Sequence, residues 1–301
     1  MDARSAVGSM VMSVLLAHAA TGRVARELSL AWNFEPVVVA PVIATAAIYL
    51  RGWRMASRRM PARFGVRHLV ATMAGLASIV LALDSPLDTL NDVLLQAHMT
   101  QHLLLMKVAP PLLWMGAPVA PMLLGLPKPL RRRVAMALAA PPVRRVAHVL
   151  TDPVVSWVAF GVSFWAWHVP VLYDMALDSE RWHEVEHACL FVTGVLFWRP
   201  VILPWPSRSR WPRWAMVPYL ALADLQNSVL SAILTFSDRV IYPFYDTVSR
   251  PGGLSALEDQ AIAGVIMWVP GSLLLLLPMV WLVATALAES AHPRRAAFGR
   301  R

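Results

Sequence analysis

The sequence contains nine histidines, and the spacing of four of them suggests chemistry. His98 and His102 are four residues apart, and His183 and His187 repeat that spacing later in the chain. Residues i and i+4 lie on one face of an α-helix, so each pair would present two imidazoles in one direction. Imidazole nitrogen is a good ligand for copper, zinc, iron and nickel. The two pairs therefore predict a metal site shared by two helices.

Three further residues extend this predicted site. His168 is expected at the same depth as the two pairs, where it would add a fifth imidazole. Met106 continues the stripe of His98 and His102 by one helical turn, and Met99 lies beside His98. Thioether sulfur favours Cu(I) over zinc. The predicted ion is therefore copper, as Cu(I), with zinc or haem as less favoured alternatives.

A peptidase motif overlaps one of the pairs. The stretch 183–187 reads His-Glu-Val-Glu-His and matches both HExxH and HxxEH. On a helix, such a motif supplies two zinc ligands and a glutamate general base. An intramembrane zinc metallopeptidase is thus an alternative function. Because nothing else in the sequence resembles a peptidase, we favour a metal-binding protein that is not an enzyme.

The composition indicates which elements must position these residues. Of the 301 residues, 57% are hydrophobic and 15% are charged, whereas soluble domains carry about 25% charged residues. The mean hydropathy of +0.54 agrees with an integral membrane protein. We predict an all-α, polytopic bundle of seven transmembrane helices. The predicted spans are 36–53, 67–83, 93–116, 151–171, 183–203, 214–236 and 258–287.

The net charge of +9 is a topology signal. Of the 27 lysines and arginines, 20 fall in alternate predicted loops and in the tail, which places them on one side. By the positive-inside rule that side is cytoplasmic, so the N-terminus is outside and the C-terminus is inside. This asymmetry removes nucleic acid as a partner and leaves the bilayer of the bacterial inner membrane. It also puts all five candidate histidines at the outer, periplasmic side.

Two charged residues are predicted inside spans. Lys107 follows the first histidine pair, and Asp224 begins a polar stripe that continues through Asn227, Ser231 and Thr235. A charge inside a membrane is costly unless it is paired. We therefore expect Lys107 and Asp224 to form a buried ion pair.

The two ends of the chain fall outside the predicted bundle of residues 32–287. Residues 1–31 form a leader that reads either as a signal peptide or as a short extra helix. Residues 288–301 form a basic cytoplasmic tail. The single cysteine, Cys189, excludes an internal disulfide. It lies two residues after His187, which turns it away from the histidine face.

Several motifs together resemble a known family. The stretch 98–105 reads His-Met-Thr-Gln-His-Leu-Leu-Leu, and it is followed by Pro-Pro-Leu-Leu at 110–113 and Gly-Ala-Pro at 116–118. Further matches are Ser-Pro-Leu-Asp at 85–88, Trp-His-Val-Pro at 167–170, Tyr-Pro at 242–243 and Glu-Asp-Gln at 258–260. This pattern resembles the multi-span CtaG family, the caa3-type cytochrome c oxidase assembly factors.

The resemblance implies a function and a set of site residues. It implies a membrane-embedded factor that handles or delivers copper on the outer side for maturation of cytochrome c oxidase. Its partners would be the copper-carrying oxidase subunit and a periplasmic copper chaperone. The metal ligands would be His98, His102, His168, His183 and His187. Glu186, Asp259, Gln260 and Met267 would be secondary contacts. A haem-binding electron carrier and a metal-free assembly scaffold remain as alternatives.

Overall fold

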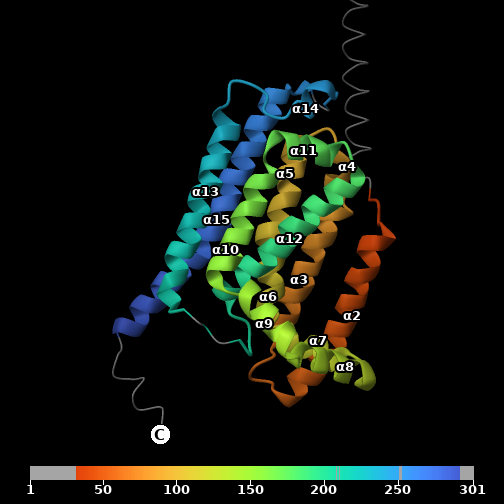
Figure 1. The fold of residues 1–301 in the computed structure, drawn as a ribbon, viewed down its shortest axis with the longest axis vertical. Coiled ribbons are helices and arrows are strands. Elements are labelled where there is room, and N and C mark those ends of the chain that lie inside the picture. Colours follow the sequence, from red (N-terminus) through yellow and green to blue (C-terminus); the bar gives the residue numbers. More distant parts are fainter. Residues whose placement is uncertain (1–31, 208, 210, 251–252, 292–301) are drawn as a thin grey trace, which may run out of the picture.

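The computed structural model describes residues 32–207, 209, 211–250 and 253–291, which contain helices and no strand. A central, interrupted helix is formed by α5 (Leu95–Leu103), η1 (Leu104–Val108) and α6 (Ala109–Met115). Six long helices make up the rest of the bundle (Figure 1). They are α2 (Pro36–Arg59), α3 (Val66–Leu83), α10 (Pro153–Trp167), α12 (Glu180–Ile202), α13 (Met216–Phe236) and α15 (Ala256–Ala291).

Short helices close the two ends of the bundle. The upper end in Figure 1 carries α4 (Pro86–Asn91), α11 (Pro170–Leu177) and α14 (Phe244–Thr247). The opposite end carries α7 (Val119–Gly125), α8 (Lys128–Ala139), α9 (Pro141–Leu150) and η2 (Arg213–Ala215).

Every predicted span overlaps a helix, but the predicted span 151–171 crosses the break between α10 and α11, where His168 lies. Five helices are long and apolar enough to cross a membrane, and the number rises to seven if each of two bent pairs is one span. The bends are 71° between Met115 and Val119 and 63° between Leu150 and Pro153. The described residues thus confirm an all-helical fold with five to seven candidate spans, as expected of a multi-pass membrane protein.

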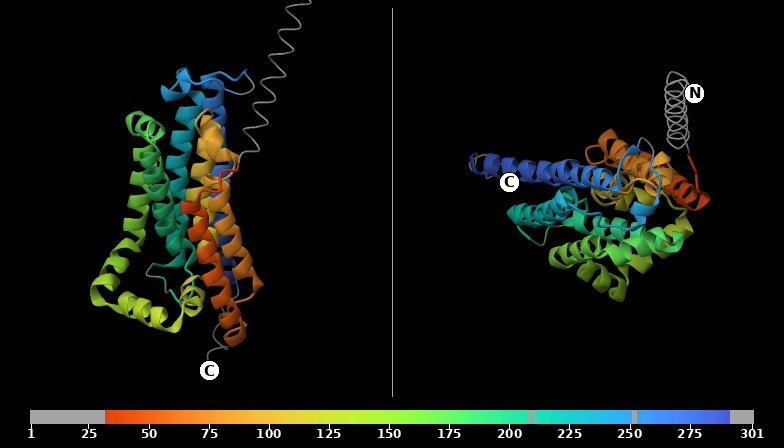
Figure 2. Two further views of the ribbon diagram at one scale, coloured as in Figure 1. Left: turned by 90° about the vertical axis from the view of Figure 1, so that its right-hand side faces the viewer. Right: turned by 90° about the horizontal axis from the view of Figure 1, so that it is seen from above.

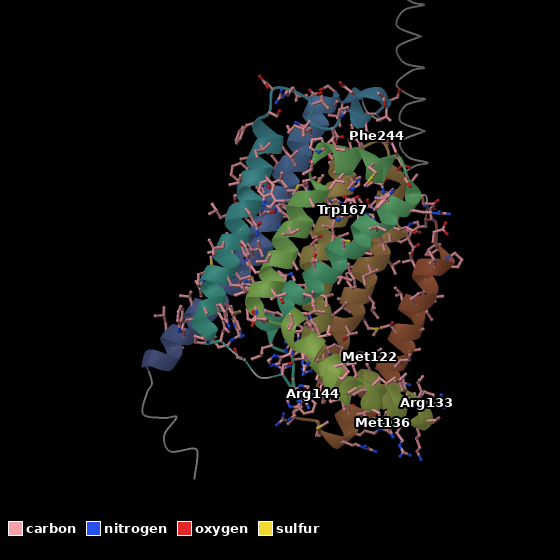
Figure 3. All side chains as sticks on the ribbon, in the orientation of Figure 1. Met122, Arg133, Met136, Arg144, Trp167 and Phe244 are labelled. Atoms are coloured by element: carbon pink, nitrogen blue, oxygen red, sulfur yellow. The ribbon has the colours of Figure 1, made fainter. Side chains whose placement is uncertain are left out.

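The two ends of the bundle differ in charge. Arg133 and Arg144 lie at the end opposite Phe244 (Figure 3). Their helices, α8 and α9, contain no buried residue, and they reach sideways from the bundle in the side view of Figure 2. A basic end opposite the α14 end agrees with the predicted charge asymmetry. The predicted leader 1–31 lies outside the described residues, as does most of the predicted tail, from residue 292 on.

Two prolines explain the interruption in the central helix. Pro110 and Pro111 have no N–H, so they cannot donate to the carbonyls of Met106 and Lys107 four residues earlier. The helix widens into the π-helical turn η1 before them. The carbonyl oxygen of Met106 instead accepts a hydrogen bond of 3.0 Å from Trp198 Nε1 of α12.

A glycine lets α12 approach this turn closely. A Cβ on Gly194 would lie 2.8 Å from the carbonyl oxygen of Met106, which is closer than real contacts allow. The hydrogen bond from Trp198 and the bare backbone of Gly194 thus hold α12 directly against the central helix. The two helices that carry the paired histidines are neighbours for this reason.

Candidate metal centre

The five predicted histidines converge on one site. His98 and His102 lie on α5, His183 and His187 on α12, and His168 directly follows α10. Their ring centroids are 4.4 Å apart for His98 and His102 and 4.2 Å apart for His183 and His187. Between helices, the centroid of His98 is 5.1 Å from that of His183, and His102 is 5.6 Å from His168. We call these five residues the histidine cluster.

The histidine cluster is almost entirely buried. His98 is 0% exposed, and His102, His168 and His187 are also buried. His183 is half-buried and is thus the member nearest to solvent.

Glu186 supplies a carboxylate to the cluster. Its side chain is fully buried, with Oε2 3.5 Å from His98 Nε2 and Oε1 3.4 Å from His102 Nε2. Glu184 is exposed. In the overlapping motif, therefore, the glutamate of HxxEH faces the histidines and the glutamate of HExxH does not. Glu186 was predicted as a secondary contact, and these distances place it within reach of a supporting role or of direct ligation.

Hydrogen bonding leaves ligand atoms free in the cluster. His168 Nδ1 donates to the carbonyl oxygen of Phe164 at 2.7 Å, which leaves Nε2 unprotonated in a neutral ring. Nε2 of His168, His183 and His187 and both oxygens of Glu186 are buried without a hydrogen-bond partner. Buried polar atoms are normally satisfied, so a group of partnerless lone pairs calls for an explanation. These lone pairs are free to coordinate a metal ion.

The donor geometry fits a metal ion. Ligand atoms of His98, His183 and His187 all lie within 4.8 Å of one another, and so do those of His98, His102 and Glu186. Two nitrogens bound to one ion at about 2.0–2.1 Å are at most about 4 Å apart. Small side-chain rotations would therefore close either group around an ion. His98 is common to both groups and is central to the cluster.

Three methionines adjoin the inner side of the cluster. Met99, Met106 and Met267 line a small cavity together with His102 and His168. Its volume of about 10 Å³ suits a single water-sized occupant. The predicted sulfur residues are thus brought together next to two of the imidazoles. Lys107 lies at the edge of the same cavity.

Asp259 and Gln260 act at a distance from the ring nitrogens. The carboxylate of Asp259 accepts hydrogen bonds from the backbone N–H of Leu95 at 2.7 Å and of Gln96 at 3.3 Å. It thereby caps the first turn of α5, the helix of His98 and His102. Gln260 Oε1 accepts from the N–H of Ile241 at 2.7 Å, and its amide group donates to the carbonyl of Arg239. Both residues brace the elements around the site.

The predicted ion pair between Lys107 and Asp224 is not formed. Lys107 Nζ instead donates to Asn227 Oδ1 at 2.6 Å. Asn227 lies one turn after Asp224 on α13, and its own amide group donates to the carbonyl of Met267 at 3.1 Å. The asparagine reaches the lysine because the polar stripe of α13 packs along α15. The sequence indicated the stripe but not which of its members lies level with Lys107.

A tyrosine group above the cluster was missed as a unit. Tyr173, Tyr242 and Tyr245 are each at most 1% exposed. The ring of Tyr173 stacks on that of Tyr242 at 4.0 Å and lies 4.9 Å from that of His98. Burial raises the pKa of Tyr245 well above its usual value, so its hydroxyl remains a donor to the Asn91 carbonyl, at 2.7 Å. The only sequence signal for this group was the close spacing of Tyr242 and Tyr245. Both belong to a segment that is far from the histidines in the sequence.

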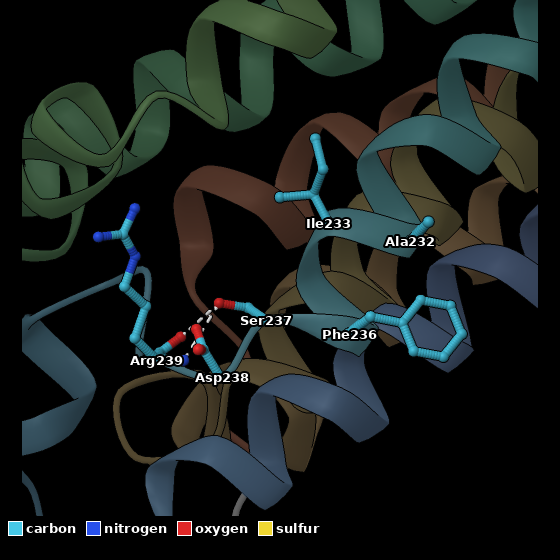
Figure 4. A pocket seen from close by; sticks show the side chains of 6 residues that line it. All are labelled: Ala232, Ile233, Phe236, Ser237, Asp238 and Arg239. Carbon is cyan, nitrogen blue, oxygen red and sulfur yellow. Dashed lines mark hydrogen bonds between the residues drawn. The ribbon is translucent and has the colours of Figure 1, made fainter.

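A larger surface cavity has no link to the cluster. It has a volume of about 560 Å³ beside the C-terminal end of α13, where Ile233, Phe236 and Asp238 line it (Figure 4). Ser237 directly follows the helix there, and its Oγ donates to the carbonyl of Arg239 at 2.7 Å. None of the predicted ligands contributes to this cavity.

Curated relatives are known from mycobacteria. The chain is 26% identical over 291 residues to uncharacterized proteins of Mycobacterium bovis and Mycobacterium tuberculosis, covering 92% of this chain and 42% of each relative. It is 26% identical over 268 residues to one of Mycobacterium leprae, covering 84% of this chain and 39% of the relative. The chain thus spans about two fifths of the length of these relatives. No solved structure matches it.

A family profile matches most of the chain. The cytochrome c oxidase caa3 assembly factor profile covers residues 47–289, which include the histidine cluster, Glu186 and Asp259. The protein therefore belongs to the caa3-type cytochrome c oxidase assembly factor (CtaG) family.

Proposed function

We propose that this protein binds copper in the histidine cluster and delivers it, on the outer side of the membrane, to a copper-carrying subunit of cytochrome c oxidase. The observation that carries the proposal is the convergence of five imidazoles and one carboxylate whose buried ligand atoms lack partners. Membership in an oxidase assembly family supports the destination of the ion. The protein would act by binding and transfer rather than by turnover.

The methionine sulfurs beside the histidines favour copper as the bound ion. Imidazole alone suits several transition metals, whereas thioether sulfur selects Cu(I). Met99, Met106 and Met267 line the cavity that His102 and His168 share. An ion bound between these groups could exchange nitrogen for sulfur ligands one at a time. Copper is here the cargo, and we expect the ion to leave toward the half-buried His183.

The alternatives receive less support. A zinc peptidase of the HExxH type needs Glu184 beside the ion, but Glu184 is exposed. The glutamate of the HxxEH motif, Glu186, does face the histidines, so a hydrolytic reaction would depend on that residue. A haem would need room for its macrocycle, whereas the cavity beside His102 and His168 has about 10 Å³. An ion therefore fits the cluster better than a porphyrin.

The direct test is an anaerobic Cu(I) titration of the purified full-length protein against a chromophoric competitor. We expect tight binding by the parent and loss of that binding in a His98→Ala, His187→Ala double variant. His68→Ala is the matched control, because His68 lies at the Arg-rich end of the bundle and is only partly buried. If the purified parent contained no metal and did not bind Cu(I), the result would contradict the proposal and favour a metal-free assembly scaffold.

A cellular experiment tests delivery separately from binding. Parent and variant genes are expressed in a bacterium that lacks its own family member, and the copper content and activity of its cytochrome c oxidase are measured. We expect only the parent and His68→Ala to restore both. Copper binding in vitro without restoration of the oxidase would argue against the proposed client.

A further inference from the structure

A second cavity lies at the Arg-rich end, far from the histidine cluster. Its volume is about 600 Å³, and it is formed between α3, α6, the end of α12 and the second half of α15. Seen from above, α15 extends beyond the rest of the bundle (Figure 2). Its wall in this region includes Leu277 and Trp281, which are 66% and 62% exposed. The cavity is therefore open toward the position of the bilayer.

The lining of this cavity is amphipathic. Most of the walls are apolar, with Met115, Val201, Ile202 and Leu282 among them. The rim carries Arg63 and Arg67, both exposed, and no residue that lines the cavity is acidic. Within the described ranges, neither arginine forms an ion pair. Two uncompensated positive charges thus stand at the mouth of an apolar cavity.

Aromatic residues indicate the depth of the cavity. Trp114, Trp205 and Trp281 line it, and the guanidinium of Arg63 lies 5.3 Å from the ring centroid of Trp205. Tryptophan is enriched where lipid headgroups meet the hydrocarbon core. Arg63 and Arg67 would then lie level with headgroups, and the apolar walls level with acyl chains.

The volume distinguishes between two kinds of occupant. A two-turn α-helix with its side chains has a volume on the order of 1,000 Å³. The cavity holds about 600 Å³, so a membrane helix of another protein does not fit inside it. A lipid chain is thinner and can enter an irregular cavity of this size.

We propose that this cavity binds one anionic phospholipid of the adjacent leaflet, with its phosphate between Arg63 and Arg67 and an acyl chain along α15. Basic pockets between transmembrane helices are suited to anionic headgroups. The site does not rest on the proposed copper function, because it shares no residue with the histidine cluster. A bound lipid would fill the wedge between α15 and the bundle.

The test uses the full-length protein in mild detergent with equal amounts of phosphatidylglycerol and phosphatidylcholine. Native mass spectrometry counts the lipids that remain bound. We expect one phosphatidylglycerol to be retained in preference to phosphatidylcholine. An Arg63→Gln, Arg67→Gln double variant should lose about thirtyfold in affinity for phosphatidylglycerol, given about 1 kcal/mol for each arginine. An Arg132→Gln, Arg133→Gln variant on α8 removes the same charge from the same end and should change the affinity less than threefold.

A second pair of variants tests the cavity without changing charge. Leu277→Trp adds volume to the cavity wall and should lower the retention of phosphatidylglycerol at least tenfold. Leu273→Trp, one turn earlier on α15 and also exposed, does not line the cavity and should have no effect. This pair keeps the test open if the double arginine variant does not fold, as judged by its elution volume and helical circular dichroism.

Three outcomes would overturn the proposal. Equal losses in the Arg63, Arg67 and Arg132, Arg133 variants would show general charge attraction and no site. Equal retention of phosphatidylcholine and phosphatidylglycerol would remove the role of the arginines. Unchanged lipid counts in Leu277→Trp would mean that the cavity is not where the lipid binds, as expected if it contacts a client protein instead.

Discussion

The interior of this protein contains two polar regions that differ in how their hydrogen bonds are satisfied. In the histidine cluster, Nε2 of His168, His183 and His187 and both oxygens of Glu186 lack partners. In the region around Lys107, the amine donates to Asn227, which in turn donates to the carbonyl of Met267. Both regions contact the same central helix. The first region lacks donors for its lone pairs, whereas the Lys107 amine and the Asn227 amide of the second are satisfied by protein groups.

This difference separates a binding site from a structural network. A buried polar atom without a partner costs about 1–3 kcal/mol, whereas a satisfied network rigidifies the helices around it. The histidine cluster accumulates several such atoms at one point, which is explained if an external ion completes it. The hydrogen bond between Lys107 and Asn227 needs no external group. Substitutions in the histidine cluster should therefore lower copper affinity with little effect on stability. Substitutions around Lys107 should lower stability with little effect on copper affinity.

The largest effect is expected for His98→Leu. His98 belongs to both ligand groups, so its loss should lower copper affinity by about a thousandfold, or about 4 kcal/mol. The metal-free protein should lose no more than about 1 kcal/mol of unfolding free energy. Leucine removes the partnerless Nδ1 atom, but it also breaks the 2.8 Å hydrogen bond between Nε2 of His98 and Nε2 of His102. Cu(I) titration and chemical unfolding in detergent measure the two quantities. If the metal-free variant were strongly destabilised, His98 would stabilise the fold itself rather than serve only as a ligand.

Asn227→Leu should give the reverse pattern. It leaves the ammonium group of Lys107 buried without a partner, which destabilises a protein by about 3 kcal/mol. Copper affinity should stay near that of the parent. The double variant Lys107→Met, Asn227→Leu removes both partners and should recover most of the lost unfolding free energy. If the double variant were as unstable as the single one, the hydrogen bond would not be the cause.

The sequence was sufficient to predict that the histidines converge, because the spacing of residues on a helix determines which side chains share a face. His98 with His102 and His183 with His187 each repeat at i, i+4, and the charge asymmetry placed both pairs at one depth. Which helices are neighbours could not be read in the same way. That contact depends on Gly194 and on the bond from Trp198 to the Met106 carbonyl. No periodic pattern marks either of them.

The errors arose where the rotation of a helix or the path of a loop decides the outcome. The π-helical turn Leu104–Val108 shifts the face of Lys107, so the amine meets Asn227 rather than Asp224. Asp259 was grouped with the metal contacts because it matches a motif, and its additional role as a cap of α5 had no sequence signal. Tyr242 and Tyr245 reach the site through a loop whose path has no local signal.

A smaller effect is expected for Glu186→Gln, which tests the contribution of the carboxylate within the histidine cluster. The carboxylate lies 3.4–3.5 Å from His98 and His102 Nε2, where it can orient the rings or bind the ion. Loss of its charge should lower copper affinity about 10- to 100-fold, as for groups that support metal ligands. Glu184→Gln is the matched control, because Glu184 is exposed, and it should leave affinity unchanged. An equal loss in both variants would point to general electrostatic attraction.

The smallest effect is expected for Asp259→Asn, which connects structure to binding. Asp259 accepts hydrogen bonds from Leu95 and Gln96 at the start of α5, and His98 follows in the first turn. The amide retains one acceptor, so we expect a loss of about 1 kcal/mol in unfolding free energy. Copper affinity should fall only a few-fold, because the turn that carries His98 becomes less ordered. The neighbouring Glu258→Gln is the control, since Glu258 bonds to Ser255 on the exposed surface and should affect neither quantity. A full loss of copper binding in Asp259→Asn would instead make Asp259 a ligand and extend the histidine cluster to α15.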